Sequence, residues 1–318
     1  MKNKKFVSFC FLILHYMDAD LTCKTVESVL NLVDFCDSQI IIVDNASPNG
    51  SGKLLKEKYN EIDNIHMVLS SENVGFSAGN NLGFRYIKDN FLTDFIVVIN
   101  NDILFPQKNF ISKVKELYKE DPFWVAGPDI FQPHKNYHSS PEADKWRTEK
   151  EIKLLVKEIE WEKEKLKKNF SICGLKLYLK DCYAKSMIVR LIIKLNRYMQ
   201  GQKKAYDKRG INVVLQGSCL IFDKRYCEKN EELFLPLTFM YAEEEILTWN
   251  CKKNNWEIKY FPEIQVWHEN HGSSQLSGMA YRQYCDKKIL DMNQVIKAHK
   301  AYLKLLDSEN QQHKYKPD

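Results

Sequence analysis

Residues 39–50 read Gln-Ile-Ile-Ile-Val-Asp-Asn-Ala-Ser-Pro-Asn-Gly, an apolar run followed at once by polar and turn-forming residues. Isoleucine and valine favour strands, and a run without polar alternation is typical of a strand buried on both faces. Asp, Asn, Ser, Pro and Gly together are a turn signal. The stretch therefore predicts a central strand of a parallel sheet that ends in a polar turn.

The sequence around this strand, up to about residue 130, keeps alternating between apolar runs and helical patterns. Such alternation implies βαβ crossovers, and hence an α/β fold with a mostly parallel, Rossmann-like sheet flanked by helices. In chain order we predict strand 7–14, helix 21–33, strand 39–43, helix 53–59, strand 65–69, helix 77–88 with Ser77 as N-cap, strand 95–99 and helix 109–119. Ligands of these sheets bind beyond the carboxyl ends of the strands, where we expect the functional residues.

The second half of the chain interrupts this rhythm and then resumes it. After the interruption we predict strand 213–222, helix 243–253, strands near Ile258 and Val266, and a long helix over 280–306. We expect four parts: an α/β half over 1–133, a basic helical insertion over 134–210, a second half of the same domain over 211–278, and a C-terminal helix and tail over 279–318.

Charge is unevenly distributed along the 318 residues. The net charge is +5, but residues 145–209 hold 19 Lys and Arg against 8 Asp and Glu. Within them, 186–199 (SMIVRLIIKLNRYM) sets Arg190, Lys194 and Arg197 among apolar residues at near-helical spacing. Such a helix either lies in a membrane interface, attracted by anionic lipids, or packs its apolar stripe on the α/β domain. Aromatic residues are sparse among the basic ones, so we expect no nucleic-acid binding.

The cysteines and the N-terminus bear on the cellular compartment. The nine cysteines are scattered and form no C-x-x-C pair, which argues against a disulfide framework or a zinc site and favours a reducing cytosol. The basic start and apolar residues 6–14 imitate a signal peptide, but no small-residue cleavage site follows. We expect this run to be a buried first strand.

Two polar motifs follow predicted strands in the first α/β half. Asp44 and Asn45 end the second strand, where they either bind a base or ribose or only form a turn. Asn101 and Asp102 follow the strand 95–99. An acidic residue there is suited to Mg²⁺ or Mn²⁺, which bind one or two carboxylates together with substrate phosphates; the alternative is a polar turn.

A third motif opens the predicted helix 77–88 and reads Asn73-Val-Gly75-Phe-Ser-Ala-Gly79-Asn-Asn-Leu-Gly83. Its glycines allow close backbone approach, either to a ligand or to a neighbouring strand, and free N–H groups at a helix start attract anions. The segment lacks the fingerprints of dinucleotide-binding and P-loop proteins. This argues against an oxidoreductase or a nucleotidyltransferase.

The second half adds two further candidates. Glu243, Glu244 and Glu245 enter a helix after an apolar stretch, where they either complement the helix dipole or supply a general base. His268 ends a strand and is either structural or a neutral metal ligand, with His271 as a competitor.

Taken in order, these motifs resemble those of the bacterial family 2 glycosyltransferases, particularly the rhamnosyltransferase-like members with a GT-A fold. The family's motifs are V-D-N-x-S, N-x-G-x-x-x-G-N-N, a D-x-D-like triplet, a Y-x-E-D-type motif, and V-x-H followed by G-x-S. The resemblance covers about residues 5–130 and 212–275. Two positions depart from it: the triplet is Asn-Asn-Asp and the acidic pair is Glu-Glu.

The resemblance implies a function and a role for each matching residue. The enzyme would transfer a hexosyl or deoxyhexosyl group, with inversion, from a nucleotide-diphosphate sugar to a glycan or lipid-linked acceptor, at the cytoplasmic face of the membrane. A degraded GT-A binding or scaffold protein is the alternative. The implied residues are Asp44, Asn45, Asn73, Gly75, Gly79 and Asn101 for the donor, Asp102 and His268 for a divalent Mn²⁺ or Mg²⁺, and Glu244 or Glu243 as the base. Within the pair, the resemblance selects Glu244.

Overall fold

The computed structural model describes residues 4–168, 205–269 and 281–314. It contains two compact units: Met1–Trp146 with Tyr206–Asn270, and Arg147–Ala205 with His271–Asp318. The basic segment 186–199, with Arg190, Lys194 and Arg197, lies outside the described residues, as do His271 and the G-x-S residues 272–274.

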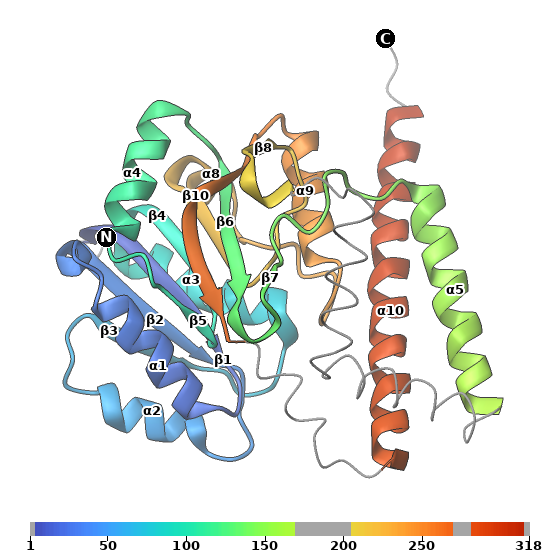
Figure 1. The fold of residues 1–318 in the computed structure, drawn as a ribbon, viewed down its shortest axis with the longest axis horizontal. Helices are drawn as coiled ribbons and strands as arrows, with labels where there is room; N and C mark the ends of the chain where they lie inside the picture. Colours follow the sequence, from blue (N-terminus) through green and yellow to red (C-terminus); the bar gives the residue numbers. More distant parts are fainter. Residues whose placement is uncertain (1–3, 169–204, 270–280, 315–318) are drawn as a thin grey trace. The chain divides into compact units, whose positions relative to one another are not determined.

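The first unit is a mixed sheet with helices on both faces (Figure 1). Its strands run in the order β3-β2-β1-β4-β9-β6-β10-β5, with β7 beside β6 and β8 beside β10. Their bounds are β1 Lys5–His15, β2 Ser38–Asp44, β3 Ile65–Leu69, β4 Phe91–Asn100, β5 Ile103–Leu104, β6 Val125–Gln132, β7 Tyr137–His138, β8 Gly210–Ile211, β9 Cys219–Asp223 and β10 Ile258–His268. Strands β1 to β4 pair in parallel, as do β6 and β10, while β9 runs antiparallel between β4 and β6. The carboxyl ends of β1, β2, β4, β6 and β10 therefore share one edge.

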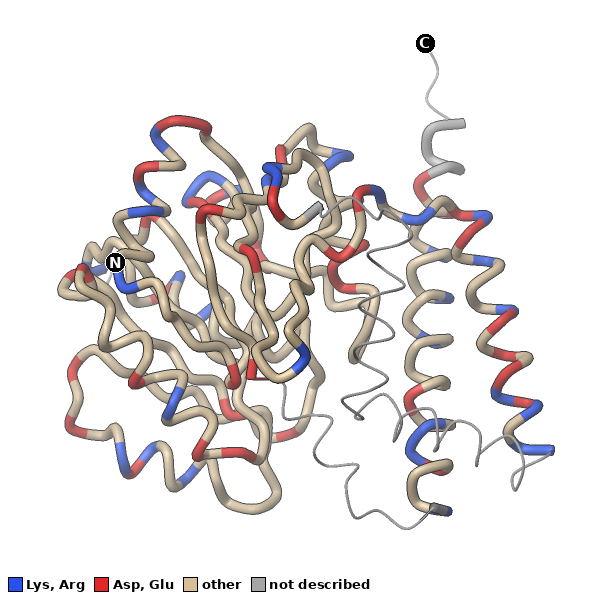
Figure 2. Tube along the Cα trace, in the orientation of Figure 1, with Lys and Arg blue, Asp and Glu red and all other residues tan. Residues whose placement is uncertain are grey.

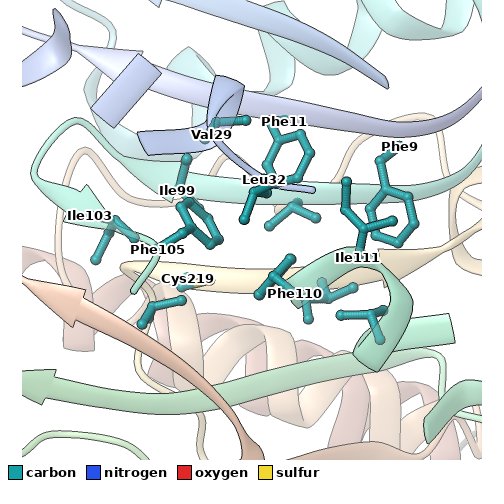
Figure 3. Close-up of a cluster of buried hydrophobic side chains, with 14 of the residues drawn as sticks. Phe9, Phe11, Val29, Leu32, Ile99, Ile103, Phe105, Phe110, Ile111 and Cys219 are labelled. Carbon is teal, nitrogen blue, oxygen red and sulfur yellow. The ribbon is translucent and has the colours of Figure 1, made fainter. Parts of the chain in front are cut away.

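Alternate residues of the central strands enter two different cores. Phe9, Phe11 and Ile13 of β1 face one cluster, and Cys10 and Leu12 face the other. The first cluster also takes residues from α1 (Ala19–Leu30), α2 (Ser51–Tyr59) and α4 (Phe110–Glu120), and the second from α3 (Gly75–Asn90), α8 (Lys224–Lys229) and α9 (Glu243–Lys253). Figure 3 shows side chains of the first cluster lying close together, among them Phe9, Phe11 and Phe105. Burial on both faces confirms the expected α/β fold with a mostly parallel sheet.

Three local expectations were wrong. The strands expected near Ile258 and Val266 are a single strand, β10. Helix α3 begins at Gly75 rather than Ser77, and Ser77 is not its N-cap, because side chains outside the helix accept its first N–H groups. Strand 213–222 is shorter than expected, since β9 starts at Cys219. The preceding residues turn toward α9, where the N–H of Gly217 bonds to Glu244 instead of to a neighbouring strand.

The second unit contains two long helices, α5 (Glu149–Lys168) and α10 (Tyr281–Lys314), which pack side by side (Figure 1). Helix α5 starts with a capping box in which Thr148 and Glu151 bond to each other's backbone N–H groups. Ile152, Val156 and Leu166 are its buried residues, and an ion pair joins its Glu160 to Lys300 of α10. Over the residues described here, no helix is both long and apolar enough to cross a bilayer.

Candidate active site at the carboxyl ends of the strands

The register of the central strands brings two predicted site segments to one edge. His15 pairs with Asp44 at the ends of β1 and β2, and Leu14 pairs with Asn100 at the end of β4. The turn after Asp44 and the Asn101–Asp102 turn therefore lie next to each other at the carboxyl ends of these strands. This edge is where open α/β sheets bind ligands.

Strand pairing brings Asp102 and His268 together. The short strand β5 pairs with β10 so that His268 lies opposite Ile103, the residue after Asp102. His268 Nε2 is 3.2 Å from Asp102 Oδ1, and the side chains are only 10% and 15% exposed. The other ring nitrogen of His268, Nδ1, is buried without a hydrogen-bond partner in the described structure.

This pair suits a divalent cation that is also held by phosphate. In the described part of the chain, no group of three His, Cys, Asp or Glu side chains has a metal-binding arrangement. The Asp102 carboxylate and the His268 imidazole would supply two protein ligands to such a cation. Mg²⁺ typically takes one or two carboxylates and fills its remaining positions with water and substrate phosphates, and Mn²⁺ shares its preference for oxygen ligands. The residues thus fit a metal that binds together with a nucleotide diphosphate.

Asn45 joins the end of β2 to the start of α3 by hydrogen bonds. Its Nδ2 donates to Asn73 Oδ1 at 3.0 Å and to the Gly75 carbonyl at 3.1 Å, and its Oδ1 accepts from Val74 N–H at 3.0 Å. Asn73 Oδ1 also accepts from Gly75 N–H at 3.1 Å. These side chains accept hydrogen bonds from backbone N–H groups that we expected to be free to bind an anion. Only Asn73 of this set is exposed.

Gly75 also touches the loop that leads to the acidic helix α9. Its φ is +84°, and a Cβ built on it would lie 2.1 Å from the Phe239 carbonyl oxygen. The next residue, Phe76, donates its N–H to this same oxygen at 2.8 Å. A glycine is therefore required here by backbone contact as well as by φ. Gly79, in contrast, is buried against Leu14 and Asn45, the contact expected of a glycine that packs its helix on the sheet.

Asp44 and Asn101 are both engaged in hydrogen bonds around the end of β1. Asp44 is buried, and its Oδ1 accepts from Ser47 N–H at 3.2 Å and from the Ser47 hydroxyl at 2.5 Å. Asn101 Nδ2 donates to Thr22 Oγ1 of α1 at 3.1 Å. In this structure both residues shape their turns, the alternative that the sequence left open for each.

The buried His15 joins these two turns. Its Nδ1 lies 2.6 Å from Thr22 Oγ1 and its Nε2 lies 2.8 Å from Ser51 Oγ, at the start of α2. Because the Thr22 hydroxyl donates to the Asp18 carbonyl, His15 Nδ1 must carry the proton that Thr22 accepts. Burial lowers the pKa of His15, although Asp44 and Asp18 act in the opposite direction. The ring therefore stays neutral.

The acidic residues at the start of α9 lie in an environment that disfavours charge. Glu243 is 6% exposed with Oε1 buried and unpartnered among the described atoms, while Glu244 Oε1 accepts from Gly217 N–H at 3.2 Å. Burial raises the pKa of Glu244 to about 8, and the charges of Glu243 and Glu142 add to the effect. Burial likewise raises the pKa of Glu243 to about 7. Such values place both carboxyls near the operating range of a general base.

The backbone before α9 holds this pair in an unusual conformation. Tyr241 and Ala242 have φ of 76° and 65°, and Ala242 is the N-cap. Two consecutive left-handed residues that are not glycine are uncommon, and they point to a function rather than to a stability optimum. Gly217, which contacts Glu244, precedes Ser218, whose carbonyl bonds to Asn100 N–H at the end of β4. Hydrogen bonds through Gly217 and Ser218 thus connect the acidic pair to the end of β4, which Asp102 follows.

Sequence reasoning missed four contributors: His15, Glu142, Gly217 and the Phe239 carbonyl. A histidine that ends an apolar strand was the one visible signal among them. The other three act through backbone groups or long-range charge, which single-sequence patterns do not show.

The fold and this edge together define an α/β protein with a cluster of polar and acidic side chains at the carboxyl ends of its strands. Comparison with known proteins identifies the family: the model of glycosyl transferase family 2 matches residues 10–186, more than half of the sequence. The chain belongs to this family, and its sheet is a GT-A-like glycosyltransferase fold. The narrower rhamnosyltransferase-like label stays a prediction.

Individual relatives match very different shares of the chain. The low-salt glycan biosynthesis hexosyltransferase Agl10 of Haloferax volcanii is 31% identical over 97 residues, which is 30% of this chain and 29% of Agl10. The chain thus matches less than a third of that relative's length. Crystal structures of S. aureus TarS 1–349, alone and with UDP, cover 90% of this chain and 71% and 70% of theirs, at TM-scores of 0.50 and 0.51. Because their sequence identity to this chain is only 11%, the structural similarity shows a shared fold and nothing about function.

Proposed function

We propose that the chain is a metal-dependent, inverting glycosyltransferase that moves a hexosyl or deoxyhexosyl group from a nucleotide-diphosphate sugar to an acceptor hydroxyl. One observation carries the proposal. Hydrogen bonds and strand pairing connect both the Asp102–His268 pair and the Glu243–Glu244 pair to one edge of a family 2 sheet. A site with a metal-type pair and a tuned carboxylate has the groups that such a transfer needs.

The donor would bind across the ends of β1, β2 and β4. We assign Asp44 to the nucleoside. Asn73, Gly75 and Asn101 would lie beside the nucleotide, and Asn45 and Gly79 would support them from behind. Asp102 and His268 would hold a Mn²⁺ or Mg²⁺ ion. When bound, this ion neutralises charge that develops on the departing nucleotide diphosphate. TarS has been crystallised with UDP, which supports a nucleotide site in this fold.

Glu244 would remove the proton from the acceptor hydroxyl. Its contact with Gly217 N–H fixes one carboxylate oxygen and leaves the other for the acceptor. The raised pKa makes this carboxylate a stronger base than an exposed glutamate. With one base and no assigned nucleophile on the opposite face, a single displacement inverts the anomeric carbon.

We also propose a glycan or lipid-linked sugar as acceptor and the cytoplasm as the compartment. Agl10 is named for glycan biosynthesis, and the seven cysteines within the described residues are free thiols, which supports a reducing environment. The membrane contact expected for 186–199 stays a prediction from sequence, because that segment lies outside the described residues.

Donor hydrolysis tests the proposed function at low cost. The protein is incubated with a panel of nucleotide-diphosphate sugars and Mn²⁺, with and without excess EDTA. We expect hydrolysis of one donor class, abolished by EDTA and by Asp102→Ala. Binding of a donor without any turnover, with or without acceptors, would instead favour the degraded scaffold. Full activity in excess EDTA would refute the metal role.

A further inference from the structure

The outward face of α5 carries its charges in an ordered way. The helix contains seven lysines and six glutamates, so it is nearly neutral as a whole. At 100° per residue, however, one face collects five of the lysines with a single glutamate, Glu164. These lysines are exposed and are Lys150, Lys153, Lys157, Lys165 and Lys168. Figure 2 shows lysines along the whole length of α5.

Two large apolar side chains lie on the same lysine-rich face. Leu154 is 56% exposed and Trp161 is 63% exposed, and they are seven residues apart, two helical turns. The Lys165 ammonium lies 4.4 Å from the centre of the Trp161 ring, a cation–π distance. The buried residues of α5, Ile152, Val156 and Leu166, lie on the opposite side. Packing among the described residues of the unit therefore does not account for the exposure of Leu154 and Trp161.

The composition of this face selects its partner. Five lysines favour an anionic partner, and a leucine and a tryptophan between them favour one with an apolar layer beneath its charge. A membrane with anionic headgroups offers both, since tryptophan prefers the interface and lysine stems lie along apolar surface while their ammonium groups stay in water. Nucleic acid offers phosphates, but nothing for an isolated leucine.

We propose that the face of α5 defined by Lys150, Lys153, Leu154, Lys157, Trp161, Lys165 and Lys168 docks on an anionic lipid surface. The lysines supply attraction to the headgroups, and Leu154 and Trp161 enter the interface. This docking is independent of the proposed sugar transfer, so its test requires no enzyme activity.

Vesicle sedimentation with the full chain measures this docking. Vesicles of phosphatidylcholine contain increasing fractions of phosphatidylglycerol, and binding should rise with that fraction and fall with added salt. Each lysine near such a surface strengthens partitioning about fivefold, so Lys150→Gln, Lys153→Gln and Lys157→Gln together should weaken it about 100-fold. As the matched control, Lys24→Gln, Lys56→Gln and Lys119→Gln remove three exposed lysines of the other unit and should change it less than about twofold.

Tryptophan fluorescence locates the contact. Brominated lipids should quench the wild-type protein, and Trp161→Phe should remove most of that quenching. Leu154→Ser should weaken partitioning about tenfold. The proposal is overturned if the protein stays in the supernatant at every lipid composition, or if both triple variants bind equally. Binding without Trp161-dependent quenching, or binding that an oligonucleotide displaces completely, overturns it as well.

Discussion

Gly75→Ala is the substitution whose effect the structure specifies most closely. The new methyl group would lie 2.1 Å from the Phe239 carbonyl oxygen and 2.8 Å from its carbon, and the residue would keep a φ of +84°. A left-handed alanine costs about 1–2 kcal/mol, and overpacking against a rigid neighbour costs a further 1–3 kcal/mol or so. We therefore expect the free energy of unfolding to fall by about 2–5 kcal/mol.

Gly50→Ala is the matched control for Gly75→Ala. Gly50 has a similar φ of +76°, but a Cβ there meets nothing within 4 Å. Its alanine should cost only the conformational part, about 1–2 kcal/mol. The difference between the variants, measured by urea unfolding, isolates the contact with Phe239.

The same substitution separates two roles for Gly75. If the loop at Phe239 yields to the methyl group, Phe76 loses its hydrogen bond and the backbone that positions Glu243 moves. Turnover should then fall more than donor affinity, which calorimetry with a panel of nucleoside diphosphates measures. If Gly75→Ala is no less stable than Gly50→Ala yet binds donor poorly, the glycine serves ligand approach alone and the reasoning from Phe239 is refuted.

Four further predictions concern the site. Glu244→Gln should lower turnover by roughly 10²–10⁴-fold with little change in donor binding; a dead Glu243→Gln beside a near-normal Glu244→Gln would reverse the assignment. Asp102→Ala and His268→Ala should each abolish most metal-dependent transfer, and unchanged Mn²⁺ dependence would contradict the pairing. Because burial raises the pKa of Glu243 to about 7 and of Glu244 to about 8, from 4.5, the folded protein keeps protons that the unfolded chain has lost. Stability to urea should therefore fall as pH rises from about 4.5 to about 8. This fall should be less steep in Glu244→Gln. The rate of sugar transfer should increase over the upper part of the same pH range. Asn45→Ala removes three hydrogen bonds and should lower unfolding free energy by about 1–3 kcal/mol.

The sequence predicted the elements that depend on local pattern. Strand β2 follows from its run of isoleucines, and the edge position of Asp44 and Asp102 follows from the parallel order of strands. The pairing of Asp102 with His268 was implied by family resemblance, and the β5–β10 ladder shows how the chain achieves it. These features rest on periodicity and on chain order, which one sequence displays.

Tertiary contacts account for what sequence reasoning missed. Helix α3 begins at Gly75 and not at the predicted Ser77, because Asn45, far away in sequence, accepts a hydrogen bond at the start of the helix. The strand expected from 213 begins later because Gly217 turns to meet Glu244. The two contacts join residues that are 29 and 27 positions apart, and no local propensity encodes them.

The stereochemistry of transfer tests the central claim most directly. The protein is supplied with the nucleotide-diphosphate sugar that it hydrolyses, Mn²⁺ and a hydroxyl acceptor, and the anomeric coupling constant of the new glycoside is read by NMR. Glu244 acting as base in one displacement predicts a product with the anomeric configuration opposite to that of the donor. A product that retains the donor's configuration would contradict the account.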